Sequence, residues 1–226
     1  MTEARRLRGA LFDLDGTLLD TAPDIANAMN RLLREERRAE LPFEQMRCQV
    51  SNGTAAVLRL AYADAGESDF AALLQRLLAH YREHIAVHTR PFAGFEATLR
   101  ALEVAGIPWG VVTNKPGWLT DPLLDALQLL QRAACVVSGD SLTERKPHPR
   151  PLLIAAALMH REPGECVYLG DAQRDIDAAR AAGMLALGAR FGYLGPDDEP
   201  DTWRAAAWLD QPTDLLAWFQ LHAGDN

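Results

Sequence analysis

Short runs of apolar residues recur along the chain at wide intervals, at residues 9–12, 107–112, 134–137, 166–169 and 184–187. Each run is too short for a buried helix and has the length of a strand that is covered on both faces. Between the last four runs lie segments with helical periodicity. In residues 174–183, for example, Ile176 and Ala179 share one face and Gly183 ends the helix. This alternation predicts an α/β fold with a Rossmann-like, doubly wound parallel sheet.

One interval interrupts the alternation. Residues 21–92 contain no strand pattern, only helix-like runs at 25–37, 43–65 and 70–86. A helical stretch between the first and second strands predicts an inserted, all-helical domain. We therefore expect a core domain made of residues 1–20 and 93–226, an inserted domain of residues 21–92, and hinges near Asp20 and residues 91–94. A polar loop at 192–200 and a final helix from about Asp214 complete the predicted fold.

The charge balance narrows the classes of partner. The chain has 31 acidic and 23 basic residues, a formal net charge of −8, and no basic block. It therefore lacks the electrostatic pattern of a nucleic-acid or anionic-membrane binder. No run of 18 apolar residues and no signal peptide is visible, and the three cysteines form no CxxC pair. We expect a cytoplasmic protein with reduced thiols.

The segment Asp13-Leu-Asp15-Gly16-Thr17 follows the first apolar run directly. In an open α/β sheet, ligands bind beyond the carboxyl ends of the strands. Two carboxylates two positions apart, followed by a glycine, place both acids there on a tight turn. This pattern favours phosphoryl transfer through an aspartyl phosphate, with Asp13 as the nucleophile and Asp15 as the general acid and base. Gly16 lets the backbone turn, which frees the main-chain oxygen of Asp15 to bind a metal.

Two further strands end in residues that can hold a phosphate. The run 107–112 leads into Thr113 and Asn114, where a hydroxyl and backbone N–H groups can cradle the anion. After the third strand, Lys146 can neutralise both the nucleophile and the phosphoryl oxygens. An ordinary strand-to-turn transition and a solvated surface lysine are the alternative interpretations.

The fourth strand ends in Gly170-Asp171, and Asp175 follows four residues later. Asp171 then lies at the strand tip and Asp175 one helical turn further on, so both side chains can point into the same crevice. Hard carboxylate oxygens beside a phosphate suit Mg²⁺. Helix-capping acids are the alternative interpretation.

These four segments match, in order, the four motifs of the haloacid dehalogenase-like hydrolases, and the helical insert resembles the C1-type cap of that superfamily. The sequence Val-Thr-Asn-Lys-Pro at 112–116 and the cap layout resemble its phosphoglycolate phosphatase group. More narrowly, segments 86–89, 109–116 and 192–203 are similar to N-acetylmuramic acid 6-phosphate phosphatases of cell-wall recycling. The resemblance covers nearly the whole chain.

The resemblance implies a cofactor and roles for individual residues. Mg²⁺ would be held by Asp13, the main-chain oxygen of Asp15 and Asp171, with Asp175 binding or supporting it. Thr113 and Lys146 would bind phosphate. The implied activity is hydrolysis of a small carboxylated phosphomonoester, either N-acetylmuramic acid 6-phosphate or phosphoglycolate.

Substrate selection should come from the inserted domain. Its loop carries a cation, small hydrogen-bonding side chains and a flexible glycine, at Arg47, Ser51, Asn52 and Gly53. Because an arginine binds a carboxylate through a planar fork, we expect Arg47 to hold the substrate carboxylate, with Lys115 as the second choice. A solvated arginine on a helix face is the alternative interpretation.

Several other functions remain in competition. A dehalogenase would not use Asp15, Asp171 and Asp175, and a phosphonate hydrolase needs a lysine in the inserted domain, where none occurs. A sugar-phosphate mutase of the β-phosphoglucomutase type stays open, and a non-catalytic binding module is disfavoured by the two motif acids.

The histidines and the oligomeric state complete the predictions. His80, His84 and His88 would form one row on a helix, with a solvated polar face favoured over a metal site because no further ligand accompanies them. We expect a monomer or a homodimer that binds only a small-molecule phosphate.

Overall fold

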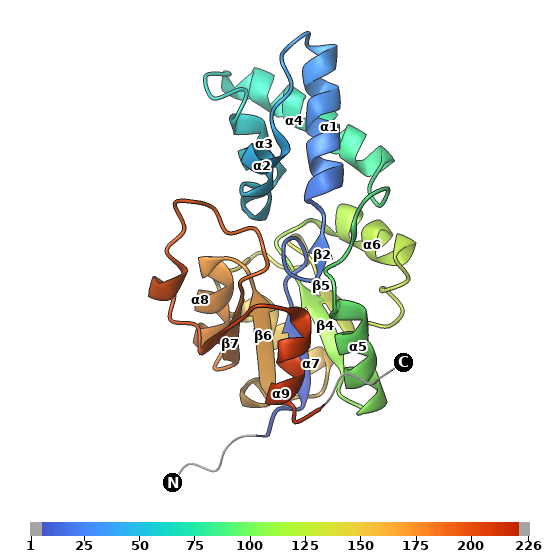
Figure 1. The fold of residues 1–226 in the computed structure, drawn as a ribbon, viewed down its shortest axis with the longest axis vertical. Coiled ribbons are helices and arrows are strands. Elements are labelled where there is room, and N and C mark those ends of the chain that lie inside the picture. The colour runs from blue at the N-terminus through green and yellow to red at the C-terminus, as the bar shows by residue number, and fades with distance from the viewer. Residues whose placement is uncertain (1–5, 222–226) are drawn as a thin grey trace.

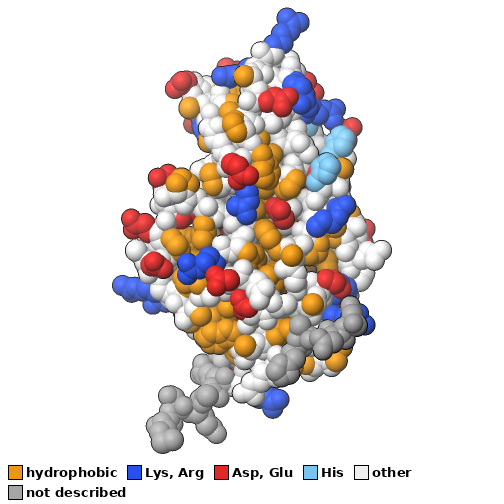
Figure 2. Space-filling model, in the orientation of Figure 1, with side chains coloured by type: hydrophobic (Ala, Val, Ile, Leu, Met, Phe, Trp, Pro, Cys, Tyr) orange, Lys and Arg blue, Asp and Glu red, His pale blue; other side chains and the backbone are white. Residues whose placement is uncertain are grey.

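The computed structural model describes residues 6–221 (Figure 1). An α/β layer contains the central sheet, and a group of helices stands beyond one end of its strands. On the face shown in Figure 2, acidic and basic side chains are interspersed over both parts. Within the described residues, no helix is both long and apolar enough to cross a membrane.

The central sheet has six parallel strands in the order β5-β4-β1-β6-β7-β8. They are β1 (Gly9–Phe12), β4 (Trp109–Val112), β5 (Cys135–Val137), β6 (Cys166–Gly170), β7 (Leu185–Ala189) and β8 (Ala207–Leu209). The first five correspond to the five apolar runs, so the predicted parallel sheet is confirmed. β8 was not predicted. Because β1 lies between β4 and β6, the residues that follow these three strands meet at one edge.

Helices cover both faces of the sheet. They are α5 (Phe95–Val104), α6 (Gly117–Ala126), α7 (Arg150–Leu158), α8 (Gln173–Ala181) and α9 (Leu215–Trp218). Phe12 packs in one buried apolar cluster with residues of α5 and α6, whereas its neighbour Leu11 packs in another with residues of α7 and α8. Successive strand residues point to opposite faces. Both faces are therefore buried, which explains the continuous apolar runs.

The remaining helices form a separate group, which we call the helical unit. It consists of α1 (Ala22–Glu35), α2 (Phe43–Arg47), α3 (Thr54–Arg59) and α4 (Glu67–Glu83). These helices share an apolar cluster of their own, which Leu119 and Tyr193 of the α/β layer join. The helix-like run predicted at 43–65 is broken, because a 3-10 turn at Val50–Asn52 and Gly53, with φ of 90°, separate α2 from α3.

Two short strands connect the helical unit to the sheet. β2 (Leu19–Asp20) and β3 (Arg90–Pro91) pair antiparallel, with Leu19 opposite Pro91 and Asp20 opposite Arg90. The two chain crossings therefore lie side by side. The pair lies where the hinges were expected, although neither segment shows a strand pattern.

Two predictions about individual residue types were tested. All three cysteines are free, and burial raises the pKa of the Cys135 thiol to about 12 and that of Cys166 to about 11. The predicted row of histidines is wrong: α4 ends at Glu83, so His84 and His88 lie beyond the helix. His80 contacts Glu35 instead, with Nε2 and Oε2 3.0 Å apart.

Candidate active site

Three carboxylates converge at the carboxyl ends of β1 and β6. Asp13 follows β1, Asp171 follows β6, and Asp175 lies in the first turn of α8. Phe12 and Leu169 are register partners on these adjacent strands, which brings the two following segments together. Ligand oxygens of Asp13, Asp171 and Asp175 lie within 4.8 Å of one another, and all three residues are buried.

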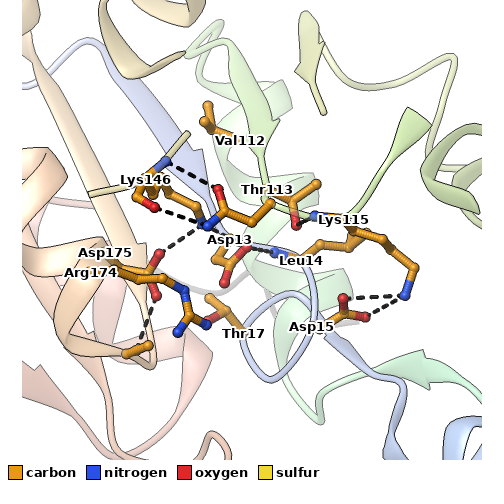
Figure 3. Close-up of polar contacts among 12 residues, drawn as sticks. Asp13, Leu14, Asp15, Thr17, Val112, Thr113, Lys115, Lys146, Arg174 and Asp175 are labelled. Carbon is orange, nitrogen blue, oxygen red and sulfur yellow. Dashed lines mark hydrogen bonds and ion pairs between the residues drawn. The ribbon is translucent and has the colours of Figure 1, made fainter. Parts of the chain in front are cut away.

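Lys146 joins two of these acids (Figure 3). Its Nζ lies 2.8 Å from Asp13 Oδ1 and 2.7 Å from Asp175 Oδ1, and it donates to the hydroxyl of Tyr168 at 2.8 Å. Asn114 fixes the backbone of Lys146 from both sides, because its Oδ1 accepts from Lys146 N at 3.1 Å and its Nδ2 donates to Lys146 O at 3.0 Å. Asn114 thus positions the lysine through its side-chain amide.

The charges at this site are not balanced by Lys146 alone. Burial would lower the pKa of Lys146, but the adjacent Asp13 and Asp175 raise it above its ordinary value, so the ammonium stays charged. Burial, with the nearby charges of Asp13 and Asp175, raises the pKa of Asp171 to about 7. The three clustered carboxylates, two of which share the ammonium of Lys146, form a donor set of hard oxygens. This set fits a divalent cation such as Mg²⁺.

A glycine is required at position 16, where the turn after Asp15 packs against Asp171. The φ of Gly16 is 82°, and a Cβ at this position would lie 2.2 Å from Asp171 Oδ2. Asp171 in turn accepts from Thr17 Oγ1 at 3.3 Å and from the backbone N–H of Tyr193 at 2.9 Å. The turn between Asp15 and Thr17 therefore packs directly on the acid of the neighbouring strand.

Asp15 is held apart from the three clustered acids. Its Oδ1 accepts from Thr21 Oγ1 at 2.7 Å, and Lys115 Nζ lies 2.9 Å from Oδ1 and 3.2 Å from Oδ2. Lys115 also donates to the hydroxyl of Tyr81 at 2.9 Å. Figure 3 shows the Asp15 carboxylate directed toward Lys115, while Asp13 faces Lys146. Burial opposes the charge of Lys115, but Asp15 and Tyr81 raise its pKa above the ordinary value.

These groups open into a cavity of about 480 Å³ between the helical unit and the strand ends. Its polar lining includes Asp13, Asp15, Thr113, Asn114 and Lys115. The helical unit contributes an apolar part, in which Ile25, Val50 and Leu78 lie. The cavity therefore combines charged groups at the strand ends with an apolar wall.

Comparison with known families identifies this arrangement. A family model described as haloacid dehalogenase-like hydrolase matches residues 10–189, a span that includes all of β1 except Gly9, the helical unit and all four motifs. The chain belongs to this family. The match extends through the whole of β7, so both sides of the cavity lie within it.

Two curated relatives of this hydrolase are named as phosphatases. The phosphoglycolate phosphatase of Xylella fastidiosa (strain Temecula1) is 44% identical over 205 residues, which cover 91% of this chain and 90% of the relative. The N-acetylmuramic acid 6-phosphate phosphatase of Pseudomonas putida is 37% identical over 211 residues, which cover 93% of this chain and 95% of the relative.

A solved structure agrees with these relatives. It is the crystal structure of a protein named as a predicted phosphoglycolate phosphatase from Haemophilus somnus 129pt, with a TM-score of 0.84 and 27% sequence identity. The match covers 93% of this chain and 97% of that chain.

The structure places most of the loop residues predicted in the helical unit at the cavity of this hydrolase. Ser51, Asn52 and Gly53 line it, and Ser51 Oγ donates to Asp171 Oδ2 at 2.7 Å. Arg47 is the exception and lies outside the cavity lining. Its Nη2 donates to the carbonyl of Gly192 at 3.1 Å, and its guanidinium stacks 4.8 Å from the ring centroid of Tyr193. In this structure Arg47 ties the helical unit to the loop after β7.

Sequence reasoning missed two arginines that line the cavity, Arg145 and Arg174. Arg174 donates to Asn52 Oδ1 at 3.4 Å and to the backbone oxygen of Ser51. Both arginines were visible beside motif residues, one immediately before Lys146 and one between Asp171 and Asp175. Their positions next to strand-end motifs were the available signal, whereas the residues predicted to bind the carboxylate were Arg47 and Lys115.

Proposed function

We propose that this hydrolase is a Mg²⁺-dependent phosphomonoesterase that acts through an aspartyl phosphate on Asp13. The observation that carries the proposal is the Asp13 carboxylate, buried at the cavity, with one oxygen 2.8 Å from Lys146 Nζ and with Asp171 and Asp175 beside it. An ammonium next to a nucleophilic oxygen also offers a partner to the phosphoryl oxygens, which carry the charge during transfer.

The reaction then has two steps. In the first, an Asp13 oxygen bonds to phosphorus while the ester P–O bond breaks, and Asp15, after taking up a proton from solvent, gives that proton to the leaving oxygen. In the second, Asp15 takes a proton from water as the water oxygen attacks phosphorus, which releases inorganic phosphate and restores Asp13. Lys146 and Thr113 hold the phosphoryl oxygens throughout. Asp13, the main-chain oxygen of Asp15, Asp171 and Asp175 would hold Mg²⁺, which would neutralise further phosphate charge.

In this proposal residues 21–92, which comprise the helical unit and the segments that connect it to the sheet, serve as a cap. Ser51 reaches Asp171, and Arg174 of α8 reaches residues 51 and 52, so contacts from both sides close the cavity over the acids. Closure excludes water from the site while the phosphoryl group is transferred. The cap also limits the substrate to a small molecule.

The cavity favours an amino-sugar acid phosphate as the substrate. A two-carbon ester such as phosphoglycolate offers little apolar surface to the side chains of Ile25, Val50 and Leu78. N-acetylmuramic acid 6-phosphate carries a phosphate, a carboxylate and two methyl groups, which match the charged and apolar parts of the lining. We therefore place it ahead of phosphoglycolate.

The test is a comparison of kcat/KM for a panel of phosphomonoesters with the purified protein and Mg²⁺. We expect N-acetylmuramic acid 6-phosphate to rank first and phosphoglycolate above esters without a carboxylate. If no ester of the panel is hydrolysed, the proposed phosphatase activity is contradicted. Conversion of a hexose phosphate to its isomer would identify a mutase instead.

Removal of the metal gives a second prediction. With EDTA in excess, the three buried carboxylates lose their divalent partner, and we expect hydrolysis of p-nitrophenyl phosphate to fall to background. Added Mg²⁺ in excess of the chelator should restore the rate, which excludes irreversible damage. Undiminished hydrolysis in EDTA, with metal content below the enzyme concentration, would contradict the assignment of Asp171 and Asp175.

A further inference from the structure

Lys115 connects the proposed acid and base to the helical unit. It follows β4, its side chain is only 5% exposed, and it lines the cavity. Its ammonium has partners on two sides, the Asp15 carboxylate and the hydroxyl of Tyr81 from α4. Its Nζ also lies 4.6 Å from the centroid of the Tyr81 ring. The lysine is thus fixed in the wall where the two layers meet.

The ion pair with Lys115 keeps the Asp15 carboxylate away from the leaving oxygen that it would protonate. A general acid must come within hydrogen-bond reach of the leaving oxygen, which in the proposed reaction is attached to the phosphorus on Asp13. In the structure Asp15 is drawn toward Thr21 and Lys115, while Asp13 contacts Lys146. Asp15 therefore has to break its contact with Lys115 before it can protonate the leaving oxygen.

The other cations in and beside the cavity have different partners. Lys146 lies outside the lining and contacts Asp13 and Asp175, and Arg174 of the lining donates to residues 51 and 52. Arg145 is exposed. Among the cations that line the cavity in residues 6–221, Lys115 is the one paired with the proton-transferring acid.

We propose that Lys115 determines specificity by exchanging partners: the substrate carboxylate replaces Asp15 at the ammonium and thereby releases Asp15 to the leaving oxygen. The inference rests on the proposed function. It makes the carboxylate act on catalysis as well as on binding, because an ester without one leaves Asp15 paired. Tyr81 keeps the ammonium in place during the exchange, since its hydroxyl contact does not depend on Asp15.

The experiment uses two esters that differ in the lactyl group that bears the carboxylate, N-acetylmuramic acid 6-phosphate and N-acetylglucosamine 6-phosphate. We expect the wild-type protein to prefer the first in kcat as well as in kcat/KM. In Lys115→Met, we expect the ratio of the two kcat/KM values to fall by about tenfold or more, because a buried charge partner is lost. Lys115→Arg keeps a cation and should recover part of the ratio.

Two control variants separate this inference from its alternatives. Arg47→Ala lies outside the cavity and should leave the ratio unchanged. If Arg145→Gln abolishes the preference and Lys115→Met retains it, the carboxylate binds at Arg145 and the inference is wrong. A wild-type protein that hydrolyses both esters equally also overturns it while leaving the phosphatase proposal intact. If the wild-type protein hydrolyses neither of the two esters, the substrate assignment itself is wrong.

A crystal structure of Asp13→Asn with N-acetylmuramic acid 6-phosphate tests the exchange without altering Lys115. We expect Lys115 Nζ within hydrogen-bond distance of the substrate carboxylate, and Asp15 turned toward the ester oxygen. A bound substrate with Asp15 still paired to Lys115 would overturn the inference, even if Lys115→Met fails to fold.

Discussion

Asp13→Asn is expected to reduce kcat for p-nitrophenyl phosphate by about 10³-fold or more, because the loss of a nucleophile removes the covalent route. Asparagine keeps the shape of the side chain but does not attack phosphorus at a useful rate. The measurement is steady-state kinetics at saturating substrate and Mg²⁺. A variant with the wild-type rate would contradict the covalent mechanism.

The fold should survive this change. Asp13 Oδ1 accepts from the backbone N–H of Leu14 at 2.7 Å, and the amide oxygen of asparagine can accept the same bond. The substitution also removes one of three buried like charges. We expect a circular dichroism spectrum and a thermal midpoint close to those of the wild type. Asp125→Asn, an exposed position on α6, is the matched control and should retain the full rate.

Lys146→Met is expected to affect stability and rate together. It removes the ammonium from Asp13 and Asp175 and leaves both carboxylates buried without that partner. The loss of one partner from a buried ion pair costs about 3–5 kcal/mol in the free energy of unfolding. Loss of its charge at the phosphoryl oxygens should lower kcat by about 10²-fold or more. Urea denaturation and steady-state kinetics measure the two effects.

A double variant distinguishes these two effects of Lys146. In Lys146→Met/Asp175→Asn, one uncompensated charge is removed, so we expect part of the lost stability to return while the rate stays low. The coupling between the two positions is read from a double-mutant cycle. If Lys146→Met alone unfolds at the wild-type urea concentration and hydrolyses at the wild-type rate, Lys146 has neither role.

The sequence predicted the parts of the fold whose pattern is local. The five apolar runs became strands because both sheet faces are covered, so each strand is continuously apolar. β8 was not predicted because Ala207 and Trp208 are half-buried at the sheet edge and belong to no long apolar run. β2 and β3 have two residues each, too few for any periodicity.

The same distinction applies to the site. Asp13 and Asp171 directly follow strands and Asp175 lies in the first turn of a helix, so topology alone brings these three together. Lys146 reaches them from the loop between β5 and α7. Contacts between the two layers depend on tertiary packing that no local pattern encodes. Arg47 illustrates this limit: its position in the loop predicted a carboxylate ligand, yet the ring of Tyr193 and the carbonyl of Gly192 take its guanidinium.

The partnership of Lys115 with Asp15 and Tyr81 was hidden for the same reason. Tyr81 belongs to α4 and Lys115 follows β4, and only the packing of the helical unit on the strand ends joins them. From its position in the sequence, Lys115 could be predicted to lie near the phosphate site, but its contacts with Asp15 and Tyr81 could not be predicted.

Covalent capture of the phosphoryl group tests the central claim most directly. The protein is mixed with substrate and Mg²⁺, quenched in acid within a single turnover, and digested for tandem mass spectrometry. A phosphoryl group on the side chain of Asp13, absent from Asp13→Asn, is the expected result. Phosphate attached to any other residue, or turnover with no phosphorylated peptide at any quench time, would contradict the account.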